Sequence, residues 1–179
     1  MLKKEITDAL NEQINKEIYS AFLYMSMSAY TNDLVLKGFA NWFMVQYHEE
    51  MYHAMKMYEY IQSQGESVVL KTVEAPPATF DSPLDAMEKT LAHEKVVTAS
   101  INDLMDLAID HRDHATKIFL EWYVTEQVEE SALFCAGTTS TDAASCSAGG
   151  ACTASASADG ACAVSAEGAA ASVAAGAPV

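Results

Sequence analysis

Four long segments of this chain repeat apolar residues in steps of three and four, and an acidic residue interrupts each repeat near its middle. Steps of three and four place side chains on one face of an α-helix. The segments extend from about residue 7 to 33, 36 to 64, 82 to 110 and 113 to 134. Because each helix has one apolar face to bury, we expect an all-α four-helix bundle.

Residues with strong positional preferences mark several expected helix ends. Thr7 is a plausible N-cap of the first helix. Ser82 precedes Pro83, and Asp85 follows three residues after the serine, which is typical of a helix N-terminus. Gly65 suits the C′ position after the second helix, where a left-handed backbone is common.

The connections predict the topology. Only a few residues join the first helix to the second and the third to the fourth, so each pair should be antiparallel. The connection from Gly65 to Phe80 has 16 residues and contains Pro76-Pro77. A helix of ~28 residues is ~42 Å long, whereas this extended connection could reach ~55 Å. It can therefore cross the whole bundle and make the second and third helices parallel.

Polar side chains occupy core-facing positions at the middle of every predicted helix. They are Glu17 on the first helix, Glu50 and His53 on the second, Glu94 on the third, and Gln127 and Glu130 on the fourth. On the second helix, the same face begins with Phe39. The midpoints of equal helices share one layer of a bundle, so four carboxylates and an imidazole should meet in the core.

A buried layer of four carboxylates needs a counter-charge. Each unpaired carboxylate would cost several kcal/mol or remain protonated. Two divalent cations bridged by a carboxylate remove this cost, and carboxylate oxygen together with imidazole nitrogen suits iron. The Glu50-x-x-His53 spacing puts both ligands on one helix face. The pattern therefore predicts a di-iron site of the kind described for carboxylate bundles.

Four stretches around this pattern form a specific signature when taken in order: Asn11–Glu17, Glu49–His53, His93–Glu94 and Trp122–Glu130. Together they resemble the bacterial and archaeal non-haem ferritins over residues 1 to about 134. The resemblance implies two iron sites that share one bridging glutamate. Site A would be held by Glu17, Glu50 and His53, and site B by Glu50, Glu94 and Glu130.

The resemblance also implies residues that surround the two irons. Gln127 corresponds to a glutamine beside site B, and Tyr24 to a tyrosine beside the centre that could donate an electron. Glu49, Glu126 and Glu129 correspond to acids that form a third iron site together with the last ligand of site B. These three acids lie beside the apolar faces, so a solvated surface position is their alternative.

The activity implied by the resemblance is that of a ferroxidase, which oxidises Fe²⁺ with O₂ or H₂O₂. The Fe³⁺ product would be deposited as mineral inside a shell of 24 identical subunits, for iron storage. One alternative is a haem-binding bacterioferritin-like protein. Bacterioferritins bind haem through a methionine just after the glutamate of the second helix, and here Met51 follows Glu50. Bacterioferritins repeat Glu-x-x-His on the fourth helix, where this chain has Gln127-x-x-Glu130, so haem is not expected. Another di-iron carboxylate oxidoreductase, or a helical interaction protein without metal, are further alternatives.

The charge and the hydropathy of the chain exclude several kinds of partner. The formal net charge is −15, with 25 acidic residues against 10 lysines and arginines. We therefore expect no nucleic acid, because phosphate contacts need clustered cations. No apolar run approaches the ~18 residues of a membrane span, and no apolar stretch follows the basic N-terminus as in a signal peptide. We expect a cytoplasmic protein without a membrane partner.

The composition changes after residue 135. Residues 1–135 form the predicted ferritin-like bundle, and residues 136–179 form a tail of small residues. The resemblance assigns this tail to the end of helix four and a short fifth helix, although its composition offers neither of them an apolar face. All four cysteines lie at or beyond position 135 without Cys-x-x-Cys spacing, so we predict neither a zinc site nor a disulfide framework.

Overall fold

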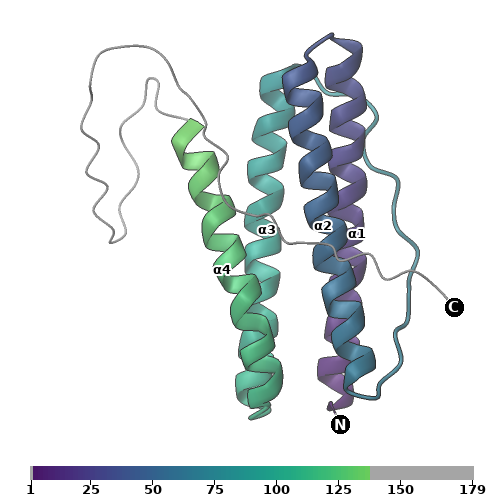
Figure 1. Cartoon of the computed structure of the whole chain (residues 1–179), viewed down its shortest axis with the longest axis vertical. Coiled ribbons are helices and arrows are strands. Elements are labelled where there is room, and N and C mark those ends of the chain that lie inside the picture. The colour runs from purple at the N-terminus through teal and green to yellow at the C-terminus, as the bar shows by residue number, and fades with distance from the viewer. Residues whose placement is uncertain (1, 138–179) are drawn as a thin grey trace, which may run out of the picture. The chain divides into compact units, whose positions relative to one another are not determined.

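The computed structural model describes residues 2–137, with side chains as far as Glu130, and this region consists of four helices (Figure 1). Their bounds are α1 Lys4–Asp33, α2 Lys37–Ser63, α3 Pro83–Asp110 and α4 His114–Gly137. No strand occurs between residues 2 and 137. The predicted all-α four-helix bundle is confirmed.

The order of the helices follows the predicted crossover topology. α1 and α2 are antiparallel, and so are α3 and α4 (Figure 1). Residues 64–82 run beside α1 from the end of α2 to the start of α3. α2 and α3 therefore point in the same direction, as the length of this connection predicts.

Hydrogen bonds to α1 fix the position of the crossover. The backbone N–H of Val69 donates to Asn11 Oδ1 at 2.8 Å, and Asn11 Nδ2 donates to the carbonyl of Ser67 at 3.4 Å. Farther along, Ser26 Oγ donates to the carbonyl of Pro77 at 2.5 Å. Since Asn11 is buried, one amide side chain sets the register of the crossover against α1.

Two of the predicted helix-end signals, Ser82 and Gly65, appear in the structure, and Asp113 adds a cap that was not predicted. Ser82 Oγ accepts from the backbone N–H of Asp85 at 3.0 Å. Asp113 Oδ1 accepts from the backbone N–H of Thr116 at 3.1 Å, just before α4. Gly65 follows α2 with a φ of 78°, in the left-handed region. These ends are determined by local side-chain and backbone chemistry.

The N-terminus of α1 differs from the prediction. The helix begins at Lys4, and the Thr7 hydroxyl donates to the carbonyl of Lys3 at 3.3 Å from inside the helix. Leu2 and Ile6 are buried in the core. Burying one such side chain contributes ~1.5–3 kcal/mol, which exceeds the ~1 kcal/mol of a typical N-cap. The packing therefore extends the helix past Thr7.

The turn between α1 and α2 contains a valine in a left-handed conformation. Val35 has a φ of 63° and is 74% exposed. Its N–H donates to the carbonyl of Asn32 at 2.9 Å, and the N–H of Leu36 donates to the carbonyl of Thr31 at 3.0 Å. These bonds close the end of α1, although a β-branched residue is disfavoured at this φ. No glycine marks this turn in the sequence.

Two apolar clusters form the core, and the polar layer lies between them along the helices. One cluster joins the start of α1 and the end of α2 to α3 and α4, and includes Leu10, Ile61, Ile101 and Leu120. The other joins the end of α1 to the starts of α2 and α3, and includes Met27, Phe43 and Ala86. The bundle therefore has apolar ends and a polar middle.

Phe39 departs from the predicted core face. It is 43% exposed, whereas Phe43 one turn later is fully buried. Phe39 lies in the first turn of α2 and lines a shallow surface groove with Gly38, Trp42 and Met87. The apolar repeat thus extends beyond the last layer that the neighbouring helices cover.

The C-terminal predictions fall largely outside the described residues. α4 continues to Gly137, two residues past the proposed boundary at 135. The rest of the 136–179 tail and the proposed fifth helix lie outside the described residues. Within the described part, no helix is both long enough and apolar enough to cross a bilayer.

Candidate metal centre

The polar residues predicted for the middle layer come together from all four helices. Glu17 of α1 and Glu50 and His53 of α2 offer ligand atoms that lie within 4.8 Å of one another. Glu50, Glu94 of α3 and Glu130 of α4 form a second group under the same limit. The groups correspond to the predicted sites A and B, and Glu50 belongs to both.

These carboxylates are enclosed and incompletely hydrogen-bonded. Glu17 is 1% exposed, Glu50 2% and Glu94 4%, whereas Glu130 is half-buried. Glu17 Oε2, Glu50 Oε2 and Glu94 Oε2 accept no hydrogen bond. Buried polar atoms normally have a partner, because desolvation without one is costly. Three such oxygens in one layer fit the demands of bound cations.

Burial and mutual repulsion both favour the protonated carboxyl groups. Burial raises the pKa of Glu17 well above its usual range, and the charge of Glu50 raises it further. Burial and the charge of Glu94 raise the pKa of Glu50 to about 8. The same two causes, with the charge of Glu50 added, raise the pKa of Glu130 to about 10. A cation that binds here must therefore displace protons.

Contacts from α4 hold His53 in place. The Tyr123 hydroxyl donates to the carbonyl of His53 at 2.8 Å. The rings of Trp122 and Tyr123 meet the imidazole edge-on, with centroid distances of 5.4 Å and 5.9 Å. His53 Nδ1 lies 3.6 Å from Glu50 Oε2, one helical turn away. The imidazole is thus oriented before any ion binds.

The two residues predicted beside the centre both donate to its carboxylates. The Tyr24 hydroxyl donates to Glu94 Oε1, and Gln127 Nε2 donates to Glu130 Oε2. Burial raises the pKa of Tyr24 well above its usual range, and the charges of Glu94 and Glu50 add to this effect. Tyr24 therefore keeps its proton and acts as a hydrogen-bond donor.

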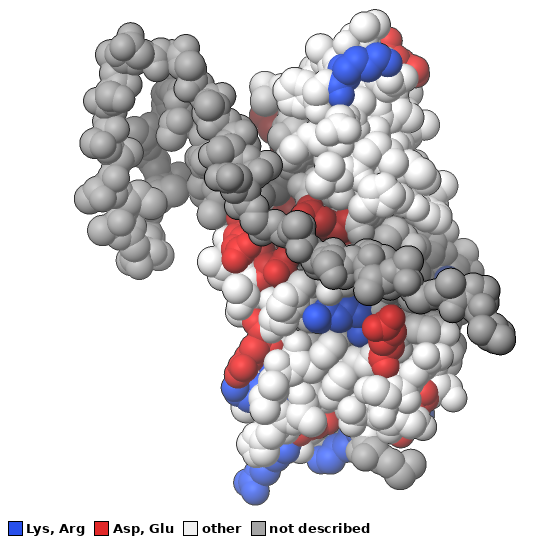
Figure 2. Space-filling view, in the orientation of Figure 1, with Lys and Arg blue, Asp and Glu red and all other residues white. Residues whose placement is uncertain are grey.

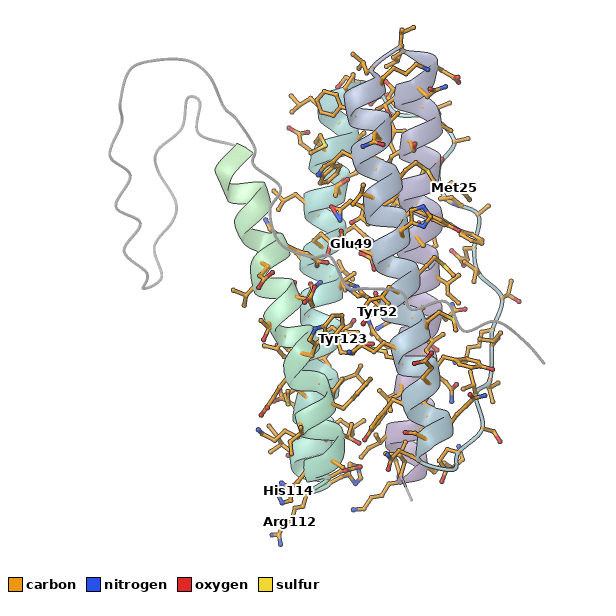
Figure 3. The ribbon with its side chains drawn as sticks, viewed as in Figure 1. Met25, Glu49, Tyr52, Arg112, His114 and Tyr123 are labelled. Atoms are coloured by element: carbon orange, nitrogen blue, oxygen red, sulfur yellow. The ribbon has the colours of Figure 1, made fainter. Side chains whose placement is uncertain are left out.

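The acids of the predicted third site lie outside both groups. Glu49 and Glu129 are exposed and Glu126 is half-buried. Figure 2 shows acidic side chains gathered near mid-height of the visible face, and Figure 3 labels Glu49 in this region, close to Tyr52 on α2. Between residues 2 and 130, neither group of candidate ligands includes these three acids. Their role as a third site stays a prediction.

Three residues near the centre were not assigned by the sequence analysis. Gln13 is buried and donates to Glu17 Oε1 at 2.9 Å. Thr98 Oγ1 donates to Gln127 Oε1 at 2.5 Å. His93 is half-buried, with its ring centroid 6.3 Å from that of Tyr24. The four-residue spacing from Gln13 to Glu17 places both on one helix face, and this signal was available in the sequence.

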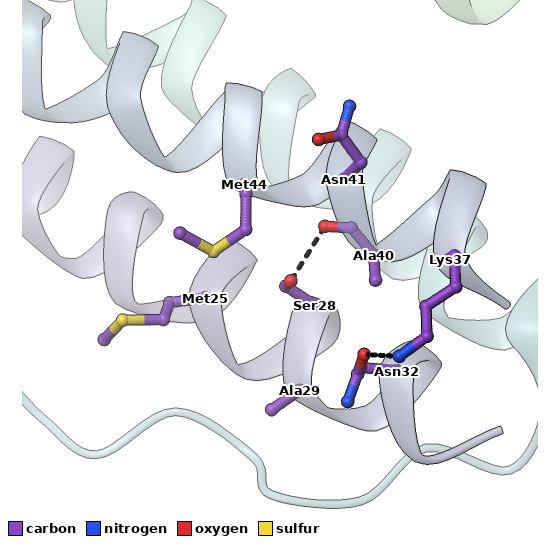
Figure 4. A pocket seen from close by; sticks show the side chains of 8 residues that line it. All are labelled: Met25, Ser28, Ala29, Asn32, Lys37, Ala40, Asn41 and Met44. Carbon is purple, nitrogen blue, oxygen red and sulfur yellow. Dashed lines mark hydrogen bonds between the residues drawn. The ribbon is translucent and has the colours of Figure 1, made fainter. Parts of the chain in front are cut away.

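A shallow groove lies between α1 and α2 (Figure 4), and none of its lining residues belongs to the carboxylate layer. It has a volume of about 430 Å³ and is lined by Met25, Ser28, Ala29, Asn32, Lys37, Ala40, Asn41 and Met44. Ser28 Oγ donates to the carbonyl of Ala40 at 2.8 Å across it. Met25 is 42% exposed, whereas Met27 and Met57 are fully buried. Met27 and Met57 therefore pack in the core, whereas Met25 lines this groove.

Known proteins share both the sequence and the fold of this region. Residues 7–136 match the ferritin-like domain family. A bacterial non-haem ferritin of Staphylococcus saprophyticus is 46% identical over 134 residues, which cover 75% of this chain and 80% of the relative. The chain belongs to the non-haem ferritin family. A second relative, the bacterial non-haem ferritin of Campylobacter jejuni, is 45% identical to this ferritin chain. The match covers 75% of this chain and 80% of the relative.

Solved structures extend the comparison. The open-pore ferritin of Archaeoglobus fulgidus is 48% identical to the ferritin chain, with a TM-score of 0.75 over 76% of this chain and 84% of the other. The Chlorobium tepidum ferritin is 40% identical, with a TM-score of 0.74 and the same coverages. These identities are high enough to show the family together with the fold.

Proposed function

We propose that this ferritin stores iron and that the carboxylate layer is its ferroxidase centre. Site A would consist of Glu17, Glu50 and His53, and site B of Glu50, Glu94 and Glu130. The observation that carries the proposal is the shared glutamate between two enclosed ligand groups. A carboxylate common to both groups can bridge two cations.

The choice of metal follows from the donor atoms. Five carboxylate or imidazole side chains supply the two groups, and this mixture of hard oxygen and borderline nitrogen suits iron. Three buried carboxylate oxygens accept no hydrogen bond. Two divalent cations would supply the missing partners and neutralise the layer. Fe²⁺ is then the substrate of the centre.

The proposed reaction is the oxidation of Fe²⁺ by O₂ or H₂O₂. Two Fe²⁺ ions give two electrons, which with two protons convert one O₂ to H₂O₂, or one H₂O₂ to two waters. The chain holds the two ions side by side and keeps the ligands oriented. The protons displaced from the carboxyl groups when Fe²⁺ binds must leave the layer. Tyr24 and Gln127 would position Glu94 and Glu130, and Tyr24 could also supply an electron.

Storage requires assembly and a path for the product. Apolar side chains are exposed on α1, α2 and the crossover, namely Phe22, Met25, Val45, Val69 and Leu70. Such residues suit contacts between copies of this chain, and we expect the 24-subunit shell of the family in the cytoplasm. Glu49, Glu126 and Glu129 would bind a third iron next to Glu130. Their greater exposure suits an ion in transit to the mineral.

The test measures size and iron oxidation together. Wild type should form a particle of several hundred kilodaltons with saturable Fe²⁺ oxidation. Glu50→Ala should slow the initial oxidation by more than the ~10–100-fold typical of residues that only support a metal ligand. Glu59→Ala is the matched control, because Glu59 is an exposed glutamate on the same helix, and its rate should equal that of wild type.

The outcomes separate the alternatives. A small dimer that does not oxidise Fe²⁺, or full activity in Glu50→Ala, contradicts the proposal. A purified protein with a haem absorption band would support the bacterioferritin-like alternative at Met51. Oxidation by a small oligomer that deposits no mineral would support another di-iron oxidoreductase.

A further inference from the structure

A chain of three hydrogen-bonded side chains leads from α3 to site A. Ser100 Oγ donates to Gln13 Oε1 at 2.7 Å, and Gln13 Nε2 donates to Glu17 Oε1 at 2.9 Å. All three residues are buried, with Gln13 and Glu17 each 1% exposed. Because the hydroxyl occupies the amide oxygen, the amide N–H must face the carboxylate.

A second chain of the same chemistry leads from α3 to site B. Thr98 Oγ1 donates to Gln127 Oε1 at 2.5 Å, and Gln127 Nε2 donates to Glu130 Oε2. Thr98 and Ser100 are two residues apart on α3, so their side chains point in directions that differ by ~200° around the helix. One hydroxyl reaches α1 and the other reaches α4.

We propose that Gln13, oriented by Ser100, is the positioning residue that fixes Glu17 for the ion at site A. This inference rests on the proposed function, because it needs a cation at that site. Gln13 engages Glu17 Oε1 and leaves Oε2, which accepts no hydrogen bond, for the ion. It is the counterpart in site A of Gln127 in site B.

The orientation of the Gln13 amide decides whether its N–H or its oxygen faces Glu17. A flipped Gln13 would bring its oxygen against Glu17 Oε1, and two acceptors repel each other. The Ser100 hydroxyl opposes that flip, since its shorter hydrogen bond, at 2.7 Å, is to the amide oxygen, and the carbonyl of Val97 is the longer alternative at 3.1 Å.

The expected effect is confined to one site. Loss of a residue that supports a metal ligand typically lowers metal affinity ~10–100-fold. Gln13→Leu should therefore weaken binding at site A within that range and leave site B unchanged. Ser100→Ala should act in the same direction but less strongly. The variant that combines Gln13→Leu with Ser100→Ala should bind the ion at site A no more weakly than Gln13→Leu alone, because both residues act through one contact.

The experiment titrates the assembled, metal-free protein with metal ions. Calorimetry measures the binding of Zn²⁺, and visible absorption follows the binding of Co²⁺. Glu17→Ala and Glu94→Ala identify the signals of site A and site B. Ser100→Thr keeps the hydroxyl and should bind like wild type, since Ser100 lines a surface groove. Ser28→Ala is the matched control, because Ser28 and Ser100 are both 7% exposed and the Ser28 hydroxyl donates to the carbonyl of Ala40 (Figure 4).

Two failures are distinguishable. If wild type binds neither Zn²⁺ nor Co²⁺ at these ligands, both the proposed centre and the role of Gln13 are wrong. If wild type binds two ions and Gln13→Leu weakens neither, or weakens both equally, only the role of Gln13 is wrong. Should Gln13→Leu not fold, the comparison of Ser100→Ala with Ser100→Thr decides, and equal affinity at site A in that pair overturns the inference.

Discussion

Leu10 and Glu17 lie two turns apart on the same face of α1, and each is at most 1% exposed. Leu10 belongs to an apolar cluster whose burial stabilises the fold without any counter-charge. Glu17 belongs to the carboxylate layer, where burial costs free energy until protons or cations compensate. Equal burial therefore has opposite consequences in these two regions, and substitutions should separate them.

The largest expected effect on folding is in the apolar cluster. Leu10→Ala removes a fully buried side chain and should lower the free energy of unfolding by ~2–5 kcal/mol. Zn²⁺ affinity of the folded variant should stay within a few-fold of wild type, because Leu10 supplies no ligand atom and lies two turns from Glu17. Denaturant unfolding and calorimetry check both parts. If Leu10→Ala weakens Zn²⁺ binding strongly as well as lowering stability, the two regions are coupled.

A substitution in the carboxylate layer should weaken metal binding without lowering the stability of the metal-free protein. Glu50→Gln keeps the shape of the side chain but removes a charge shared by sites A and B. Metal binding should weaken at both sites, by at least the ~10–100-fold seen for supporting residues. In EDTA at pH 8, the variant should melt no lower than wild type, because one buried charge is absent. A marked drop in melting temperature without metal would contradict the proposed cost of this layer.

The pH dependence sharpens the same contrast. The folded-state pKa of Glu50 is raised from 4.5 to about 8, mainly by burial, so the native state binds more protons than the unfolded state in this window. The stability of metal-free protein should therefore fall as pH rises from 4.5 to about 8. Excess Zn²⁺ should oppose that fall, since metal affinity increases as protons leave. Thermal melts with EDTA and with Zn²⁺ test this, and Glu50→Gln in EDTA should show a shallower slope.

The smallest expected effect is at a helix end far from both regions. Ser82→Ala removes the N-cap contact to the backbone N–H of Asp85. It should cost ~1 kcal/mol of stability and leave Fe²⁺ oxidation unchanged. A change in oxidation rate at saturating Fe²⁺ would indicate that the start of α3 influences the position of Glu94.

Much of this arrangement could be predicted because it follows from periodicity. Helical spacing put Glu17, Glu50, His53 and Glu94 on core faces, and the length of the crossover gave the direction of α3. These features depend on the number of residues per turn and the reach of the chain. The roles given to the residues stay proposals, since proximity alone does not establish binding.

Other features depend on competition between contacts, which spacing does not reveal. Thr7 has the side chain of an N-cap, but burial of Ile6 extends the helix beyond it. Phe39 continues an apolar repeat past the end of the covered core. The contact of Ser100 with Gln13 joins residues 87 positions apart, and a single sequence gives no signal for such a pair.

The crossover divides the bundle into two helical hairpins, and the ligand groups divide unequally between them. Glu17, Glu50 and His53 all come from the α1–α2 hairpin, whereas the other group adds Glu94 and Glu130 from the α3–α4 hairpin. A cation at site A could thus be captured by the first hairpin alone. A cation at site B would act as a removable crosslink between the hairpins, so its loss should loosen their docking before either hairpin melts.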